Sequence, residues 1–135
     1  MQTESITIHA TPNDILLPAV HLRELLVLNQ VSEEIIKSCE TALSELLKEI
    51  VEHAYHGDAH QLITVSIAYN GSGVYIETQD EGTPVEFAVS KVIAAKNLEP
   101  ATQTSELNPL QKDMLDEVWH EIDMGKNIWQ LVKYI

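Results

Sequence analysis

Three ionisable side chains, Glu45, Glu49 and His53, recur at intervals of four in the segment SELLKEIVEH. The surrounding residues have the periodicity of an amphipathic helix. At ~100° per residue, the line of ionisable side chains drifts toward the apolar stripe of that helix, so we expect it to reach the buried edge. A half-covered carboxylate costs free energy unless it is hydrogen-bonded, solvated in a cleft or bound to a cation. The spacing therefore predicts one wall of a polar pocket.

Two other interpretations of this line stay open. The first is an ordinary amphipathic helix whose border happens to be acidic. The second is a transition-metal site, because Glu49, His53, His56 and His60 recur at three- and four-residue spacing and imidazole is a common metal ligand. The spacing differs from established patterns such as HExxH, and His60 lies beyond Gly57, where the helix should end.

The elements that must position these side chains follow from hydrophobic periodicity and turn residues. We expect a strand over residues 4–10, a helix over 15–29, a longer helix from Ser32 to about Tyr55, a hairpin over 61–80 that turns at NGSG, a weakly patterned segment over 86–116, and a closing hairpin that turns at 124–127. Asn13 or Asp14 should cap the first helix and Ser32 the second. The weakly patterned segment should be mobile around residues 96–110.

This order predicts an α+β fold, a two-layer sandwich in which helices cover one face of a mixed or antiparallel sheet. A chain of 135 residues fits a single domain, 1–135, with one hydrophobic core. The single cysteine, Cys39, falls on the apolar stripe of the long helix, so we expect a buried structural thiol rather than a reactive one.

The net charge of the chain limits the classes of molecule that it could bind. With 21 acidic and 8 basic side chains the formal net charge is -13, which disfavours binding to nucleic acid or to an anionic membrane. An acidic surface is common in proteins for solubility alone, and that interpretation stays open beside the other, a protein partner with a basic patch. The first residues lack the basic and apolar regions of a signal peptide, and no apolar run approaches the ~18 residues of a membrane span, so we expect a cytoplasmic protein.

The string CETALSELLKEIVEHAYHGD, followed by a hairpin and then by Asp80-Glu81-Gly82, resembles the nucleotide motifs of the GHKL ATPase superfamily. The resemblance is greatest to its bacterial anti-sigma factor and serine-protein kinase branch, where the pattern is S-E-x-x-x-N-x-x-x-H-A-Y and then D-x-G. The closing segment DEVWHEIDMGKNIWQLVKYI and the opening strand with two helices are similar as well. The resemblance spans nearly the whole chain and implies the histidine-kinase-like ATPase fold.

The resemblance also implies site residues. Glu45 would be the catalytic general base that takes the proton of a substrate serine. Asp80 would accept a hydrogen bond from the amino group of adenine, and Gly82 would let the backbone approach the base. His53, in the H-A-Y string, would belong to the cofactor-binding residues. ATP and Mg²⁺ are the cofactors that the family uses.

Two positions depart from the family pattern. Glu49 stands where the family has the asparagine that ligates the Mg²⁺ bridging the ATP phosphates. A carboxylate is a good Mg²⁺ ligand, but it adds negative charge beside Glu45 and a tetraanionic nucleotide. The glycine-rich phosphate-binding motif aligns with TSELNPL, residues 104–110, which contains no glycine and gains a proline. We therefore expect weakened or lost ATP binding.

The resemblance and its departures together predict an anti-sigma-factor-like regulator of a bacterial partner-switching system. Such a protein would bind a sigma factor, the antagonist of the anti-sigma factor, or both. The alternative is an active Mg-ATP-dependent serine protein kinase that phosphorylates the antagonist, and an unrelated α+β domain stays open as a third interpretation. Family members often form homodimers, but nothing in the spacing tests that state.

Overall fold

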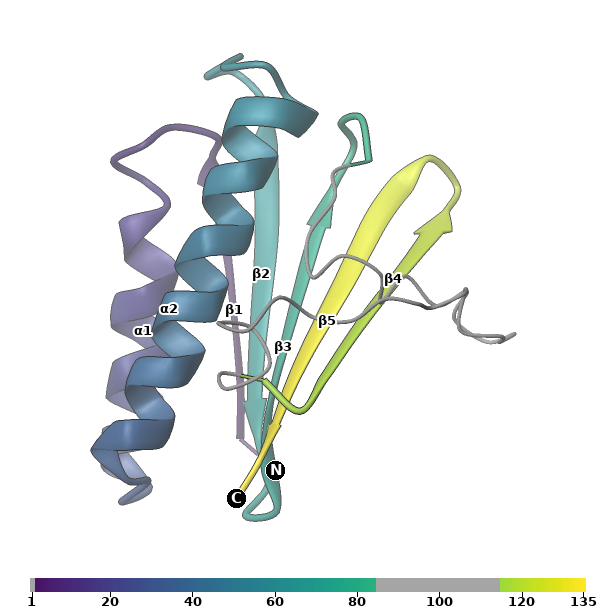
Figure 1. Cartoon of the computed structure of the whole chain (residues 1–135). Coiled ribbons are helices and arrows are strands. Elements are labelled where there is room, and N and C mark those ends of the chain that lie inside the picture. The colour runs from purple at the N-terminus through teal and green to yellow at the C-terminus, as the bar shows by residue number, and fades with distance from the viewer. Residues whose placement is uncertain (1, 85–114) are drawn as a thin grey trace.

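The fold, taken from a computed structural model that describes residues 2–84 and 115–135, is a two-layer α+β sandwich (Figure 1). The strands of the described part are β1 (Gln2–His9), β2 (Leu62–Tyr69), β3 (Gly73–Asp80), β4 (Glu117–Asp123) and β5 (Lys126–Tyr134). They form one antiparallel sheet in the order β1-β2-β3-β5-β4. Helices α1 (Leu16–Leu28) and α2 (Glu33–Glu49) cover one face, and α2 continues into the π-helical turn η1 (Ile50–Ala54). The predicted architecture is confirmed.

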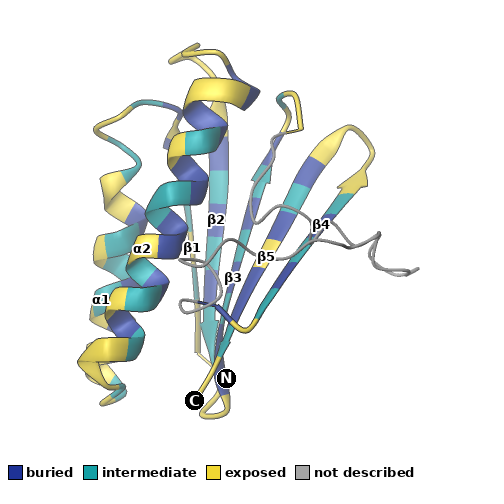
Figure 2. Ribbon diagram, viewed as in Figure 1, coloured by how far each residue is buried: buried dark blue, intermediate teal, exposed yellow. Residues whose placement is uncertain are grey.

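Helix α2 begins where its cap residues predict. The Ser32 hydroxyl accepts a hydrogen bond from the Ile35 backbone N–H at 3.4 Å, and Glu33 and Glu34 occupy the first turn, where the helix dipole favours negative charge. One face of the helix is buried against the sheet (Figure 2). Cys39 lies on that face and is fully buried, which raises the pKa of its thiol to about 12 and confirms the expected structural cysteine.

The predicted cap of helix α1 is wrong. Ile15 precedes the helix and makes no side-chain capping bond. Asp14 instead accepts a hydrogen bond from the backbone N–H of His9 at 3.1 Å, and Thr11 accepts one from the N–H of Asp14. The Asp14 side chain, which could have capped the helix, thus links the start of α1 to the end of β1. The expected end is confirmed, because Asn29 follows the last helical residue.

Arg23 holds the two helices side by side. Its guanidinium donates to Glu40 at 2.7 Å and to Glu33 at 2.7 Å, so that one side chain of α1 spans the start and the middle of α2. These bonds raise the pKa of Arg23 and lower that of Glu33. The cluster is partly exposed, so its contribution is mainly to fix geometry.

Both predicted hairpins form, and both are closed by left-handed turn residues. Between β2 and β3, the Asn70 side chain accepts hydrogen bonds from the N–H groups of Ser72 and Gly73, and Gly71 has a φ of +88°. Between β4 and β5, Met124 and Gly125 have φ values of 52° and 81°. Two consecutive left-handed residues form the tight turn that suits the twist of a hairpin.

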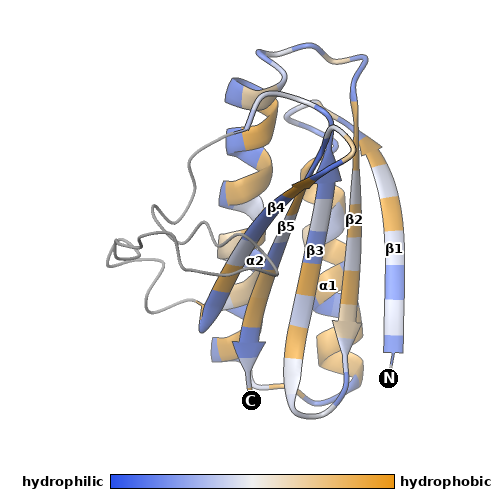
Figure 3. Cartoon of the chain, turned by 90° about the vertical axis from the view of Figure 1, so that its right-hand side faces the viewer, coloured by the Kyte–Doolittle hydropathy of each residue, from blue (hydrophilic) through white to orange (hydrophobic). Residues whose placement is uncertain are grey.

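The strand registers separate the two faces of the sheet. Ile63, Val65, Ile76, Trp129 and Leu131 point toward the helices and are almost completely buried in the core. Polar side chains, with some apolar ones among them, alternate with these residues on the opposite face, which no helix of the described part covers (Figure 3). None of the helices in residues 2–84 and 115–135 is long and apolar enough to cross a membrane. The segment expected to be mobile and most of the 86–116 stretch lie outside the described residues, as does TSELNPL.

Candidate functional site

The end of the long helix changes the direction of His53. Tyr55 donates its backbone N–H to Ile50 at 3.0 Å, an i→i+5 bond that widens the last turn. Each residue of a wider turn advances by less than the ~100° of an α-helix. His53 consequently points to solvent, with 62% of its side chain exposed, and the expectation that it lies at the buried edge is wrong.

Glu45 and Glu49 keep the positions that α-helical spacing predicts. Both are half-buried, one turn apart, on the flank of α2. Within residues 2–84 and 115–135, neither carboxylate forms a hydrogen bond or an ion pair. The two side chains therefore place two like charges one turn apart on α2, without an ion pair to any described residue.

Asp80 ends β3 in a buried hydrogen-bond network. Its Oδ1 accepts the backbone N–H of Gly82 at 2.9 Å and the side-chain amide of Asn127 at 3.0 Å. The same amide nitrogen donates to the Gly82 carbonyl at 2.7 Å. Asp80 is 3% exposed, and this burial raises the pKa of its carboxyl group although both hydrogen bonds oppose the shift. The carboxyl group is consequently fixed in orientation.

The Asp80 turn is docked onto the end of the long helix. Thr83 donates its N–H to the Ala54 carbonyl at 3.0 Å, and Glu81 donates its N–H to the Tyr55 hydroxyl at 2.6 Å. A Cβ added to Gly82 would lie 2.5 Å from the Ala54 carbonyl oxygen, so this position requires glycine for packing. The H-A-Y string and the D-x-G string thus meet in space, although Tyr55 and Glu81 are 26 residues apart in the sequence.

A buried histidine supports this network from the neighbouring strand. The imidazole of His120 on β4 lies 3.3 Å from Asn127 Oδ1 and stacks on Trp129, with ring centroids 4.3 Å apart. Burial lowers the pKa of His120. The Thr78 hydroxyl, which precedes Asp80 by two residues and so faces the same way, is buried without a hydrogen-bond partner in the described part of the chain. The surroundings of the Asp80 carboxyl group are therefore polar.

Two of these groups were not foreseen. His120 and Asn127 both stand at inward positions of alternating strands, His120 between Val118 and Ile122 and Asn127 opposite Asp80. The sequence signal for both residues is a polar side chain at a strand position where the alternating pattern calls for an apolar one. Their hydrogen-bond partners can be identified only once the pairing of β3 with β5 is known.

The transition-metal alternative fails for the residues that suggested it. The described residues contain no group of three or more His, Cys, Asp or Glu side chains able to hold a metal ion. His53, His56 and His60 are exposed, whereas Glu49 is half-buried. The π-helical turn and the left-handed His56, with a φ of 50°, separate side chains that an uninterrupted helix would align.

The lowered pKa of His120 predicts a loss of stability in mild acid. Because the folded state disfavours the imidazolium, the unfolded state binds the proton first as the pH falls through about 6.5. We expect the free energy of unfolding to fall below about pH 6.5, with a slope of at most about 1.4 kcal/mol per pH unit. Urea denaturation followed by tryptophan fluorescence measures it, and His120→Gln should abolish this component. An equal slope in His120→Gln would contradict the assignment.

Comparisons with known proteins agree with this geometry. A protein-family model described as a histidine kinase-like ATPase domain matches residues 8–108. The structure is also similar to the crystal structure of the RsbU and RsbW domains of Rv1364c from Mycobacterium tuberculosis, with a TM-score of 0.69 and 21% sequence identity. That likeness covers 98% of this chain and 32% of the other, so the chain spans about a third of the matched protein. No curated protein matches the sequence.

Proposed function

Since the chain belongs to the histidine kinase-like ATPase domain family, we propose that it is an anti-sigma-factor-like regulator of a bacterial partner-switching system. It binds a sigma factor, the antagonist of the anti-sigma factor, or both, and its binding of Mg-ATP is weakened or lost. The observation that carries this proposal is the pair of half-buried carboxylates, Glu45 and Glu49, which form no ion pair with any described residue.

The base-binding end of the site fits an adenine nucleotide. Asp80 is oriented by Gly82 and Asn127 through one oxygen, Oδ1. The hydrogen bonds among the described residues thus leave its second oxygen available to an amino group. The buried Thr78 hydroxyl, on the same face of β3, adds a polar atom that has no hydrogen-bond partner among the described residues. Asp80 and Gly82 would hold the base, in the roles that the family resemblance implies.

The phosphate-binding end fits poorly. Glu45 and Glu49 lie four residues apart on α2, a spacing at which two like charges destabilise a helix by roughly 0.2–0.5 kcal/mol. Glu49 would ligate Mg²⁺ as well as an amide does, but its charge acts against the phosphates whenever the metal does not neutralise it. The charge of Glu49 thus supports weakened or lost binding of Mg-ATP, and phosphoryl transfer belongs to the alternative function.

The alternative, an ATP-dependent serine kinase, has one observation in its favour. Glu45 is half-buried beside apolar neighbours on α2, the environment in which a carboxylate can serve as a general base. Its phosphoryl donor would still have to bind next to Glu49. Tight binding of Mg-ATP to the unaltered chain would favour this alternative over the proposed function.

Binding to the sigma factor and antagonist of the source bacterium tests the proposal. We expect complex formation with at least one of them, unchanged by Mg-ATP, because the nucleotide site is weak. With a net charge of -13 the affinity should fall at least about tenfold between about 50 mM and about 500 mM salt, as charge-steered association does. Fluorescence anisotropy measures both effects. No complex with either protein, or an affinity independent of salt, would contradict the proposal.

A further inference from the structure

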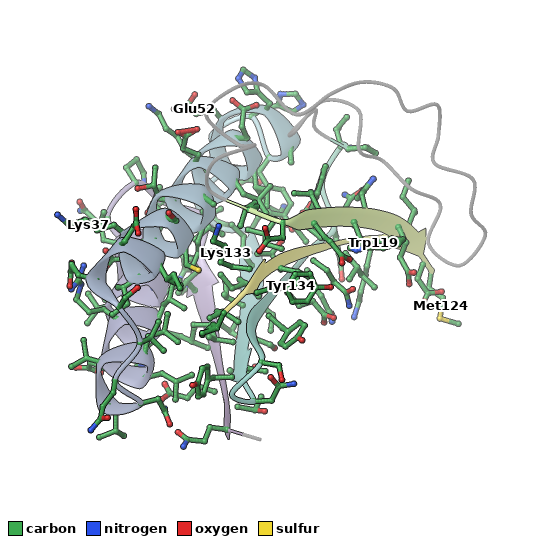
Figure 4. All side chains as sticks on the ribbon, turned by 60° about the horizontal axis from the view of Figure 1, so that its bottom comes forward. Lys37, Glu52, Trp119, Met124, Lys133 and Tyr134 are labelled. Carbon is green, nitrogen blue, oxygen red and sulfur yellow. The ribbon has the colours of Figure 1, made fainter. Side chains whose placement is uncertain are left out.

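The sheet face that points away from the helices carries two rows of side chains, set by the strand register. Ser66, Glu77, Gln130 and Trp119 form one row across β2, β3, β5 and β4, and Ala68, Tyr75, Val132 and Glu117 form the next. We call these eight residues the outer platform. Figure 4 shows Trp119 and Tyr134 on this side of the sheet and Lys133 on the helix side.

A hollow of about 210 Å³ opens between the two rows of the outer platform. Ala68 and Val132 flank Tyr75 in the register and supply an apolar floor, while Glu77 and Gln130 supply its polar side. Sites for small organic ligands usually measure about 300–1,000 Å³. The smaller volume and the mixed lining suit one long side chain with an apolar stem and a polar head.

Glu77 is held in place by neutral donors. The Gln79 amide donates to one carboxylate oxygen at 2.9 Å, and the Gln130 amide donates to the other at 3.2 Å. No ion pair of Glu77 occurs in the described part of the chain. A fixed carboxylate with its negative charge uncompensated, next to an apolar floor, is complementary to a cationic side chain.

Glu117, at the β4 end of the second row of the outer platform, is also held by neutral donors. It accepts hydrogen bonds from the Trp119 indole at 2.8 Å and from the Tyr134 hydroxyl, and the latter raises the pKa of Tyr134 to about 12. Among the described residues it too has no cationic partner. Strand spacings of about 4.8 Å and a rise of about 3.3 Å per residue place the two carboxylate-bearing positions about 12 Å apart.

We infer that the outer platform binds an extended segment of a partner protein through two arginines, one seated in the hollow with its guanidinium on Glu77 and the other on Glu117. A guanidinium matches both oxygens of a carboxylate and stacks on aromatic rings, whereas an ammonium does neither as well. Residues four apart in an extended segment are about 13 Å apart, close to the separation of the two carboxylates. The inference rests on the proposed function in assigning a protein as the occupant.

A second copy of the chain fits this face less well. Two outer platforms packed together would gather Glu77 and Glu117 of both copies, four acids, in one interface of a chain whose net charge is -13. Like charges brought together at an interface cost several kcal/mol. Charge complementarity thus selects a basic partner.

The probe is a blocked peptide, Gly-Arg-Gly-Gly-Gly-Arg-Gly, titrated into the isotope-labelled full chain and followed by NMR. We expect chemical shift changes in the amides of β3 and β5 and in the Trp119 indole. Glu77→Gln should weaken binding at least fivefold, whereas Glu24→Gln, the same charge change on an exposed position of α1, should weaken it less than twofold. Ala68→Leu, which fills the floor and keeps every charge, should weaken binding as Glu77→Gln does. The peptide with citrulline in place of arginine should not bind.

Equal losses of peptide affinity in Glu77→Gln and Glu24→Gln would overturn the inference, since they would show that the peptide is attracted only by the net charge of the protein. So would shift changes confined to other surfaces, or a dimer in sedimentation analysis that Tyr75→Ala dissociates, because a second copy would then occupy the face. The titration uses neither nucleotide nor sigma factor. Specific peptide binding by a chain that binds no sigma factor or antagonist would therefore overturn the proposed function and support the outer platform.

Discussion

Replacing Gly82 with alanine is expected to destabilise the protein by about 2–3 kcal/mol and to displace the Asp80 turn. The new Cβ would lie 2.5 Å from the carbonyl oxygen and 2.7 Å from the carbonyl carbon of Ala54, and the helix backbone cannot yield as a flexible side chain would. The turn must move instead, which breaks the bond from Thr83 to Ala54 and shifts Asp80. Urea denaturation measures the loss of stability, and the NMR signals of Asn127 and Thr83 report the displacement.

Gly57→Ala is the matched control. Gly57 has a φ of +81° and open space around its Cα, so alanine there costs only the left-handed conformation, about 1–2 kcal/mol. We expect this variant to leave the resonances of the Asp80 turn unchanged. A Gly82→Ala protein as stable as the unaltered chain would show that the turn does not pack on Ala54.

Replacing Glu49 with asparagine is expected to tighten or create binding of Mg-ATP by at least about tenfold, or about 1.4 kcal/mol. The change removes a half-buried negative charge beside Glu45 and keeps a side-chain oxygen for the metal. Isothermal titration calorimetry with Mg-ATP measures the gain. The unaltered chain should give heats too small to fit.

Glu52→Asn makes the same chemical change at an exposed position in the following turn. It should alter nucleotide affinity less than twofold, because exposed charges are screened by solvent and salt. No gain in Glu49→Asn would place the main defect in residues 104–110, where the family's glycine-rich motif is missing. An equal gain in both variants would mean that net charge, rather than position, opposes the nucleotide.

The parts of the fold that the sequence predicts well are those where several local signals agree. Helix α2 combines a serine cap, acids in the first turn and a continuous apolar stripe, and it forms as expected. The two hairpins combine strict alternation with turn residues that accept left-handed conformations. Each of these signals acts within a few residues along the chain, so the sequence alone suffices to predict the element.

The features that escaped prediction depend on tertiary contacts or on a local change of helix type. Asp14 does not cap α1, because its carboxylate accepts a hydrogen bond from the backbone N–H of His9 at the end of β1. His53 points to solvent because η1 widens the end of the helix. The types of residue around it give no sign of a π-helical turn. Asn127 joined Asp80 through pairing of strands 47 residues apart. Of the predicted site, the positions of Glu45, Glu49 and Asp80 follow from local pattern, whereas the network around Asp80 does not.

The weakened nucleotide site is the central claim, and a calorimetric titration of the unaltered chain with Mg-ATP and Mg-ADP tests it most directly. The charge pair of Glu45 and Glu49 predicts a dissociation constant of about 1 mM or weaker for Mg-ATP, or no measurable heat. Mg-ADP, with one phosphate fewer, should bind no more weakly than Mg-ATP. A dissociation constant for Mg-ATP in the range of about 1–10 μM would contradict the account and favour an active kinase.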